Sequence, residues 1–137
     1  MKNYSRFKTN YRVRPDDIDM FQHVHNSRYF DYVMAARYDH MNQFYGMSME
    51  EFITQGYGWV VRTAHVEYKR AMVMGQEFMV ETGIVSINSK GCRVSFEIKI
   101  LETGKIACDG WFDYILIDIN TKKAVNVTQE MIDKYSI

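Results

Sequence analysis

The sequence is poor in residues that break or cross-link a chain. It has one proline and eight glycines among 137 residues, with no repeat and no low-complexity segment. A chain of this length has room for one domain, and we expect a single domain over residues 1–137. The two cysteines, Cys92 and Cys108, are too few for a disulfide framework. We therefore expect reduced thiols in a cytoplasmic protein.

An excess of charge of one sign is also missing. The chain has 17 basic and 17 acidic side chains, so its net charge is zero. A nucleic-acid-binding protein shows a basic patch, and none is visible here. No apolar run reaches the roughly 18 residues that span a membrane, and the N-terminus lacks the apolar segment of a signal peptide. We expect neither a nucleic-acid nor a membrane partner, while the neutral charge favours self-association.

What the chain does contain is a long helical pattern after residue 25. Apolar side chains recur there at steps of three and four residues: Tyr29, Val33 and Ala36. The middle of this segment is apolar around much of its circumference, which predicts a helix buried on several sides. Asn26 is the expected N-cap and Gly46 the expected stop. Asp31 and His40 are expected on its surface.

The rest of the chain is typical of strands joined by turns. Residues 92–101 alternate most clearly, with Cys92, Val94, Phe96, Ile98 and Ile100 on one face. Strands are expected over residues 7–14, 59–70, 77–87, 92–101 and 106–119, and short helices begin after Ser48 and Thr128. Short connections require antiparallel pairing. The sequence predicts an α+β fold, a curved antiparallel sheet of about five strands wrapped around one long buried helix.

The stretch from Asp16 to Asn26, "DDIDMFQHVHN", concentrates titratable side chains just before that helix. A carboxylate can act as a base or a nucleophile, and a helix start offers unpaired N–H groups that polarise a carbonyl. Together they suit acyl transfer. Two other interpretations stay open at this point. Asp16, Asp17 and Asp19 could be charges that solvate the loop and cap the helix, or aspartates and histidines could bind a metal, although their spacing matches no known site.

The same stretch resembles the signature of the hot-dog thioesterases, in the branch of 4-hydroxybenzoyl-CoA, acyl-CoA and acyl-ACP thioesterases. That signature has an Asp-x-Asp pair, then Gly-His-Val-Asn-Asn, then a tyrosine. Here it reads Asp17, Asp19, Gln22-His23-Val24-His25-Asn26 and Tyr29, so Gln22 replaces the usual glycine and His25 the first asparagine. The later strand segment keeps Tyr68 and Gly75, with Ala71 for a usual proline and Gln76 for a usual aspartate.

The resemblance implies a hot-dog domain and an active site. Asp19 matches the catalytic carboxylate, as general base for water or as nucleophile, and the backbone amide of Asn26 matches the group that faces the thioester carbonyl. No metal and no cofactor is implied. Six further residues are candidates for substrate binding or for plain packing and loop support: His23, Val24, His25, Asn26, Tyr29 and Trp59. Four cations could meet the phosphates of coenzyme A, or could simply be solvated: Lys90, Arg93, Lys69 and Arg70.

The leading hypothesis is hydrolysis of an acyl thioester, with acyl-CoA or acyl-ACP as the substrate partner, by a homodimer or homotetramer. One alternative is a hot-dog hydratase or dehydratase, and the other is a non-catalytic domain that binds acyl thioesters. The order Asp-x-Asp, His-Val-x-Asn favours the thioesterase, and the presence of Asp19 argues against the binding domain. The sequence leaves the acyl group, the carrier and the choice between base and nucleophile open.

Overall fold

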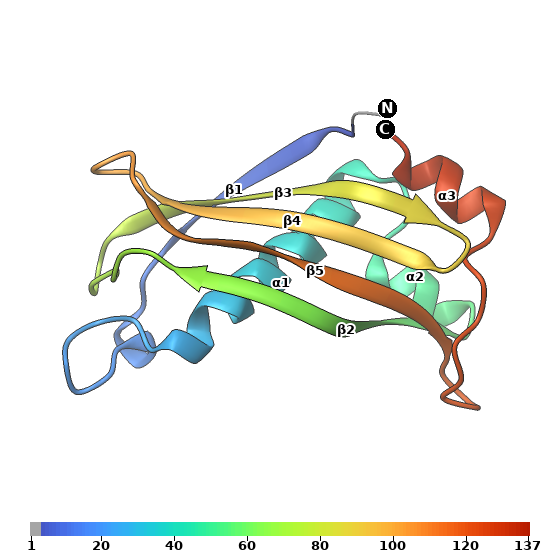
Figure 1. Ribbon diagram of the computed structural model, residues 1–137, viewed down its shortest axis with the longest axis horizontal. Coiled ribbons are helices and arrows are strands. Elements are labelled where there is room, and N and C mark those ends of the chain that lie inside the picture. The colour runs from blue at the N-terminus through green and yellow to red at the C-terminus, as the bar shows by residue number, and fades with distance from the viewer. Residues whose placement is uncertain (1–3) are drawn as a thin grey trace.

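The computed structural model describes residues 4–137, and its five strands form one antiparallel sheet in the order β1-β3-β4-β5-β2 (Figure 1). The strands are β1 (Arg6–Arg12), β2 (Tyr57–Tyr68), β3 (Glu77–Asn88), β4 (Gly91–Ile100) and β5 (Ile106–Asp118). The predicted five-stranded antiparallel sheet is therefore confirmed.

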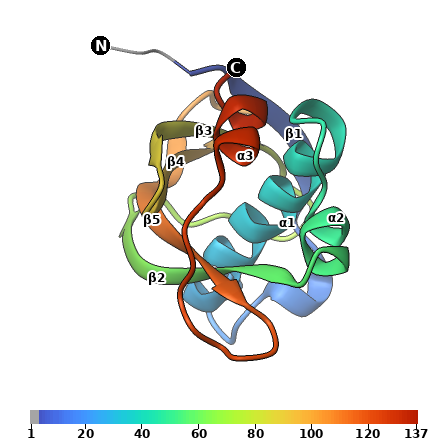
Figure 2. The same cartoon turned by 90° about the vertical axis from the view of Figure 1, so that its right-hand side faces the viewer.

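The long helix α1 (Asn26–Phe44) lies in the curve of this sheet (Figure 2). Val33 and Ala36 of α1 are fully buried, and Met41 nearly so. The sheet meets them with the alternate residues of its central strands, including Val94, Phe96, Ile98, Phe112 and Leu116. The predicted α+β arrangement of a curved sheet around one buried helix is confirmed. It arises because the two-residue period of the strands puts one apolar face of the sheet against α1.

The ends of the helices follow their capping residues. Short helices α2 (Met49–Thr54) and α3 (Gln129–Tyr135) start after Ser48 and Thr128, as predicted. Gly46 has φ +71° just after α1, the left-handed geometry of a helix stop. The predicted N-cap of α1 was wrong by one residue. His25 is the cap, with extended backbone, and its Nδ1 accepts the N–H of Ser27, so Asn26 is already helical.

The two edges of the sheet are β1 and β2. The strands β2 and β3 are consecutive in the chain but do not pair with each other. Residues 69–76 carry the chain from β2 at one edge to β3 beside β1, whereas β3–β4 and β4–β5 are joined by tight turns. The twelve-residue strand β2 is largely exposed over its C-terminal half, residues 62–68. Cys92 and Cys108 are buried free thiols. No helix in residues 4–137 is long and apolar enough to cross a membrane.

Candidate active site

The loop between β1 and α1 is fixed in place by backbone contacts on both sides. Ile18 pairs with Val24 in an isolated bridge, and His23 pairs with Val73. The N–H of Val24 donates to the carbonyl of Met72 at 2.9 Å. The loop thus lies between the start of α1 and the segment that follows β2, at the lower left of Figure 1. Chemistry-bearing residues from the two segments meet there.

The tip of this loop is a tight turn built around Gln22. The N–H of Gln22 donates to the carbonyl of Asp19 at 3.0 Å, and the N–H of Asp19 donates to the carbonyl of His23 at 2.9 Å. Gln22 has φ +67°, the left-handed region that favours glycine. The hot-dog signature has glycine at this position. The substitution therefore keeps the backbone course of the loop and places a strained glutamine there.

The carboxylate of Asp19 is half-buried and held by its own turn. Its Oδ1 accepts the N–H of Phe21 at 2.9 Å and that of His23 at 3.4 Å. Within residues 4–137, Oδ2 has no hydrogen-bond or ion-pair partner. One oxygen thus orients the group, and the other is available to a water molecule or a carbonyl carbon.

The two neighbouring aspartates have different surroundings. Asp17 is 6% exposed, and its Oδ2 accepts the hydroxyl of Tyr32 at 2.6 Å and the N–H of Arg14 at 3.2 Å. Burial and this hydrogen bond raise the pKa of Tyr32. Asp16 is exposed and pairs with the Arg14 guanidinium at 3.0 Å. Asp17 therefore ties the loop to α1, and Asp16 lies in solvent.

The start of α1 presents a free donor beside Asp19. The N–H of Asn26, the first helical residue, has no partner within the described residues, as expected of the first turn of a helix. Asp19 and Asn26 line the same cleft, whose volume is about 260 Å³. Its walls are Asp19, His23, Val24, Asn26, Tyr29, Tyr68, Lys69, Arg70 and Ala71. The helix dipole adds positive potential at this end of α1.

Tyr29 forms the floor of the cleft with a fixed orientation. Its hydroxyl accepts the N–H of Met72 at 3.1 Å, and its ring meets that of Tyr68 edge-on at 5.5 Å. Burial raises the pKa of its phenol. Tyr29 is 2% exposed, so most of its side chain packs in the core. It also lines the cleft.

The structure brings seven of the predicted residues to one cleft, Lys69 and Arg70 among them, and places four elsewhere. His23, Val24, Asn26 and Tyr29 join Asp19, whereas His25 caps the helix beside them. Trp59 packs between Phe52 and Tyr114 near the other end of β2. In this chain, Lys90 and Arg93 lie beside the β3–β4 turn, at the opposite end of the sheet from the loop (Figure 1).

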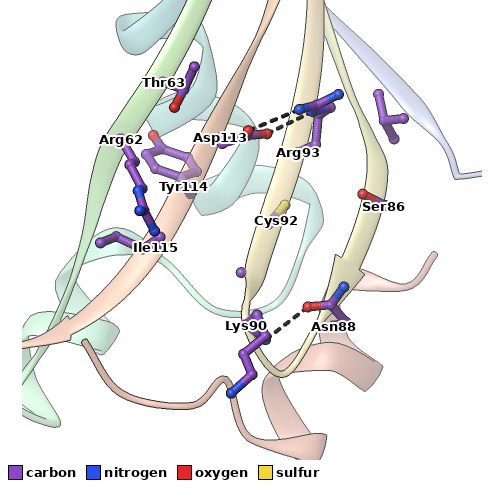
Figure 3. Close-up of a pocket in the computed structure, with 12 residues that line it drawn as sticks. Arg62, Thr63, Ser86, Asn88, Lys90, Cys92, Arg93, Asp113, Tyr114 and Ile115 are labelled. Atoms are coloured by element: carbon purple, nitrogen blue, oxygen red, sulfur yellow. Dashed lines mark hydrogen bonds and ion pairs between the residues drawn. The ribbon is translucent and has the colours of Figure 1, made fainter.

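Lys90 and Arg93 line a different groove of about 590 Å³ across β2, β3, β4 and β5 (Figure 3). There the Arg93 guanidinium makes two hydrogen bonds to Asp113, at 2.7 and 3.0 Å, and stacks 3.8 Å from the centre of the Trp111 ring. The pKa of the Asp113 carboxyl is lowered by this arginine. Arg93 is therefore already paired within its own chain.

Two cations do border the cleft, at the end of β2. Lys69 is paired with Asp109 at 2.8 Å, which raises its pKa, and the Arg70 Nη1 donates to the carbonyl of Ile106 at 3.2 Å. The other N–H groups of the Arg70 guanidinium make no hydrogen bond in residues 4–137. Tyr68 and Ala71 were not predicted as site residues, although Tyr68 belongs to the segment that resembles the hot-dog family.

The carboxylate of Asp19, with one unpaired oxygen, and the unpaired N–H of Asn26 line one cleft. This arrangement is suited to attack on a carbonyl carbon and to stabilisation of the oxyanion that results. In the described part of the chain, no group of three or more His, Cys, Asp and Glu side chains is arranged to hold a metal ion. The fold and this cleft define the class of the hot-dog thioesterases, and comparison with known proteins agrees.

Residues 13–134 match the model of the thioesterase-like superfamily, and the chain belongs to that family. It is 25% identical over 127 residues to the long-chain acyl-CoA thioesterase FadM of Escherichia coli K12, covering 93% of this chain and 95% of FadM. Its fold is similar to DHNA-CoA thioesterase from Staphylococcus aureus, with TM-score 0.89, 22% identity and coverage of 96% and 89%. It also resembles the 12:0-ACP thioesterase from Umbellularia californica, with TM-score 0.80, 19% identity and coverage of 94% and 49%.

Proposed function

We propose that this thioesterase-family enzyme hydrolyses an acyl thioester of coenzyme A or of acyl-carrier protein to a free acid and a thiol. The supporting observation is that the free Oδ2 of Asp19 and the unpaired N–H of Asn26 border one cleft. FadM and the DHNA-CoA thioesterase, which each match most of this chain, are named as thioesterases of CoA substrates. The 12:0-ACP thioesterase shares the fold. The chain acts as one hot-dog domain over residues 1–137.

In this mechanism the thioester carbonyl oxygen accepts the N–H of Asn26. The partial positive charge at the start of α1 stabilises the negative charge that develops on that oxygen. Asp19 then acts in one of two ways. As a base, it takes a proton from water while the water oxygen attacks the carbonyl carbon; the tetrahedral intermediate then collapses with cleavage of the C–S bond, and the departing thiolate takes up the proton. As a nucleophile, its oxygen displaces the thiolate and forms a mixed anhydride, which water hydrolyses.

The substrate approaches with its acyl group over Tyr29 and its carrier towards solvent. Val24 and Tyr29 give the cleft an apolar wall, and His23 lies at its rim. Arg70 is the cation best placed for a phosphate of the carrier, since it borders the cleft and keeps unpaired N–H groups. Lys90 and Arg93 reach a substrate only from a second copy of the chain, whereas Trp59 packs between Phe52 and Tyr114, away from the cleft.

We further propose that the enzyme is a homodimer or a dimer of dimers whose active site lies between two copies. The loop tip exposes Met20 at 85% and Phe21 at 72%, and the turn beside it exposes Met74 at 57%. The adjoining edge strand β2 has unpaired backbone groups along its outer side. A second copy would cover both surfaces.

The test of the activity is release of free thiol from a panel of acyl-CoA and acyl-ACP thioesters that vary in chain length and aromatic character. We expect turnover of at least one member. Hydration of an enoyl thioester without thiol release would support the hydratase instead. Tight binding of acyl-CoA without either reaction would identify a binding domain.

A further inference from the structure

The outer face of the sheet, on the side away from α1, contains two β-bulges at the same level. Arg62 of β2 is an extra residue, because its two neighbours in sequence pair with consecutive residues of β5. Val85 of β3 is extra in the same way against β4. The two bulges flank the paired residues Arg93 and Asp113 of the central strands. Bulges bend their strands and redirect side chains, and they are frequent beside functional sites.

Both bulges border the groove of about 590 Å³ that Figure 3 shows. Each bulge turns two consecutive residues towards the groove, Arg62 with Thr63 and Val85 with Ser86, where a regular strand presents only alternate ones. All four residues are exposed. The volume of the groove lies within the range of small-molecule sites. The bulges therefore shape a hollow in the sheet that can hold a small molecule.

The groove has an excess of positive charge, although the net charge of the chain is zero. Its lining contains three cations, Arg62, Lys90 and Arg93, and one carboxylate, that of Asp113. Arg93 holds this carboxylate with two hydrogen bonds, which lower the pKa of Asp113 and keep it ionised. Within residues 4–137, the side chains of Arg62 and Lys90 make no hydrogen bond and no ion pair. Two cations are therefore available to an anionic ligand.

The charges of this face are separated along the strands. A second groove of about 490 Å³ on the same face contains four acidic side chains: Glu67, Glu81, Glu97 and Asp109. Glu97 lies four residues from Arg93 on the same side of β4. An anion that approaches this face is thus repelled by the second groove and attracted to the groove of Arg62 and Lys90.

We propose that the groove of Arg62 and Lys90 binds a small phosphomonoester that is not the reacting thioester. A phosphomonoester is close to a dianion near pH 7. The planar guanidinium of Arg62 can donate two parallel hydrogen bonds to its phosphate, and Lys90 supplies the second positive charge. The hydroxyls of Thr63 and Ser86 suit a polar ligand body. The turn that contains Lys90 lies at the opposite end of the sheet from the loop of Asp19, so this ligand does not reach the cleft of its own chain (Figure 1).

Calorimetric titration with AMP tests the proposal, because AMP is a phosphomonoester small enough for the groove. Adenosine is the matched ligand without the phosphate. At constant ionic strength, we expect AMP to bind at millimolar or lower concentrations, with one site per chain, and adenosine not to bind. Absence of AMP binding, or equal binding of adenosine, would overturn the proposal.

Two substitutions identify the cations that hold the phosphate. Arg62→Gln and Lys90→Gln each remove one positive charge and keep a polar side chain, so each should weaken AMP binding at least about fivefold. Lys105→Gln is the matched control. Lys105 is exposed in the β4–β5 turn, lies outside the groove, and its side chain has no partner within residues 4–137. If either groove variant binds AMP as tightly as Lys105→Gln does, the proposal is wrong.

NMR spectroscopy separates the groove from the cleft. Addition of AMP should shift the backbone amide signals of Thr63, Ser86 and Gly91 and leave those of Asn26 and Tyr29 in place. Shifts at Asn26 and Tyr29 instead of the groove would contradict the assignment.

Coenzyme A carries the same chemical group on a larger molecule, so competition identifies the source of the phosphomonoester. Coenzyme A should displace AMP only at concentrations at least as high as those at which AMP itself binds, because most of its mass lies outside the groove. Displacement at lower concentrations would make the groove part of the carrier's site and would overturn the proposal. None of these measurements follows thiol release, so this site and the proposed thioesterase activity succeed or fail separately.

Discussion

Among single residues, Asp17 makes the contacts that hold the loop before α1. Asp17→Ala removes the acceptor of the Tyr32 hydroxyl and of the Arg14 N–H, and leaves a half-buried donor unpaired. We expect the free energy of unfolding to fall by about 1–3 kcal/mol, measured by urea denaturation. Asp16→Ala is the matched control, since its exposed pair with Arg14 should contribute less than about 0.5 kcal/mol. Equal losses in the two variants would contradict the assignment of Asp17.

His40 gives the stability of the protein a pH dependence. Its ring nitrogens lie 2.8 Å from the Thr9 Oγ1 and 2.7 Å from the Thr82 Oγ1. Burial, with Arg37 nearby, lowers its pKa to about 4. In the unfolded chain its pKa is about 6.5, so between these values the unfolded state binds a proton that the folded state does not. Stability is therefore lost as pH falls through this window.

The contribution of His40 amounts to about 2 kcal/mol between pH 7 and pH 5. His40→Gln should show a correspondingly smaller fall in the free energy of unfolding over that interval, measured by urea denaturation at both pH values. Aspartates and glutamates titrate in both proteins, so the difference between the two isolates the histidine. The same fall in both proteins would show that His40 is not the titrating group.

The sequence predicted Asp19 and six of its neighbours in the cleft. Four of them belong to the same short motif as Asp19, and the other two, Lys69 and Arg70, were candidates as cations at the end of a strand. It missed the polar core behind them. His40 was expected on the surface of α1 and is fully buried, and Arg37 was not singled out. Both lie on the helical stripe that runs from Val33 at steps of four and three residues. The helical period places both residues on the buried face of α1. Histidine and arginine are usually exposed, however, so their burial is recognised only from the side chains packed around them.

At the scale of the element, the N-terminus of α1 depends on His25. Its Nδ1 accepts the N–H of Ser27 at 3.2 Å, which satisfies one of the free donors of the first turn. His25→Ala should lower the free energy of unfolding by about 1 kcal/mol in urea denaturation. His25→Asn is the control. Asparagine is a strong N-cap and is usual at this position of the hot-dog signature, so we expect nearly full stability. A loss equal to that of the alanine variant would show that capping is not the role of His25.

Element positions were predictable where local chemistry sets them. Ser48 is the predicted start of α2, and the structure shows it forming a capping box with Glu51. Gly46 ends α1 because a left-handed residue terminates the hydrogen-bond pattern. The cap of α1 was misplaced by one residue, since asparagine is the commoner cap and the histidine side chain takes the role here. The order of strands in the sheet could not be predicted from strand patterns alone, because β2 pairs with β5 across a long separation in sequence.

At the scale of the whole molecule, the proposed assembly rests on the exposed loop tip. Phe21→Glu places a charge where we expect a second copy to pack. The variant should be monomeric by light scattering and should lose most of its thiol release. Ile53→Glu is the matched control, because Ile53 is 53% exposed on α2, outside both the loop and the groove of Lys90 and Arg93. An active monomer at assay concentration, for the unmodified chain or for Phe21→Glu, would contradict the shared site.

The most direct test of the account is the turnover of Asp19→Asn. The variant preserves the shape of the side chain and the acceptor for the turn, and removes the charge that serves as base or nucleophile. With a substrate found in the thiol-release panel, we expect kcat to fall at least about a hundredfold while KM changes little. Asp16→Asn, exposed beside the same loop, should retain activity close to that of the unmodified enzyme. If Asp19→Asn releases thiol as fast as Asp16→Asn, then Asp19 is not catalytic and the cleft beside the start of α1 is not the active site.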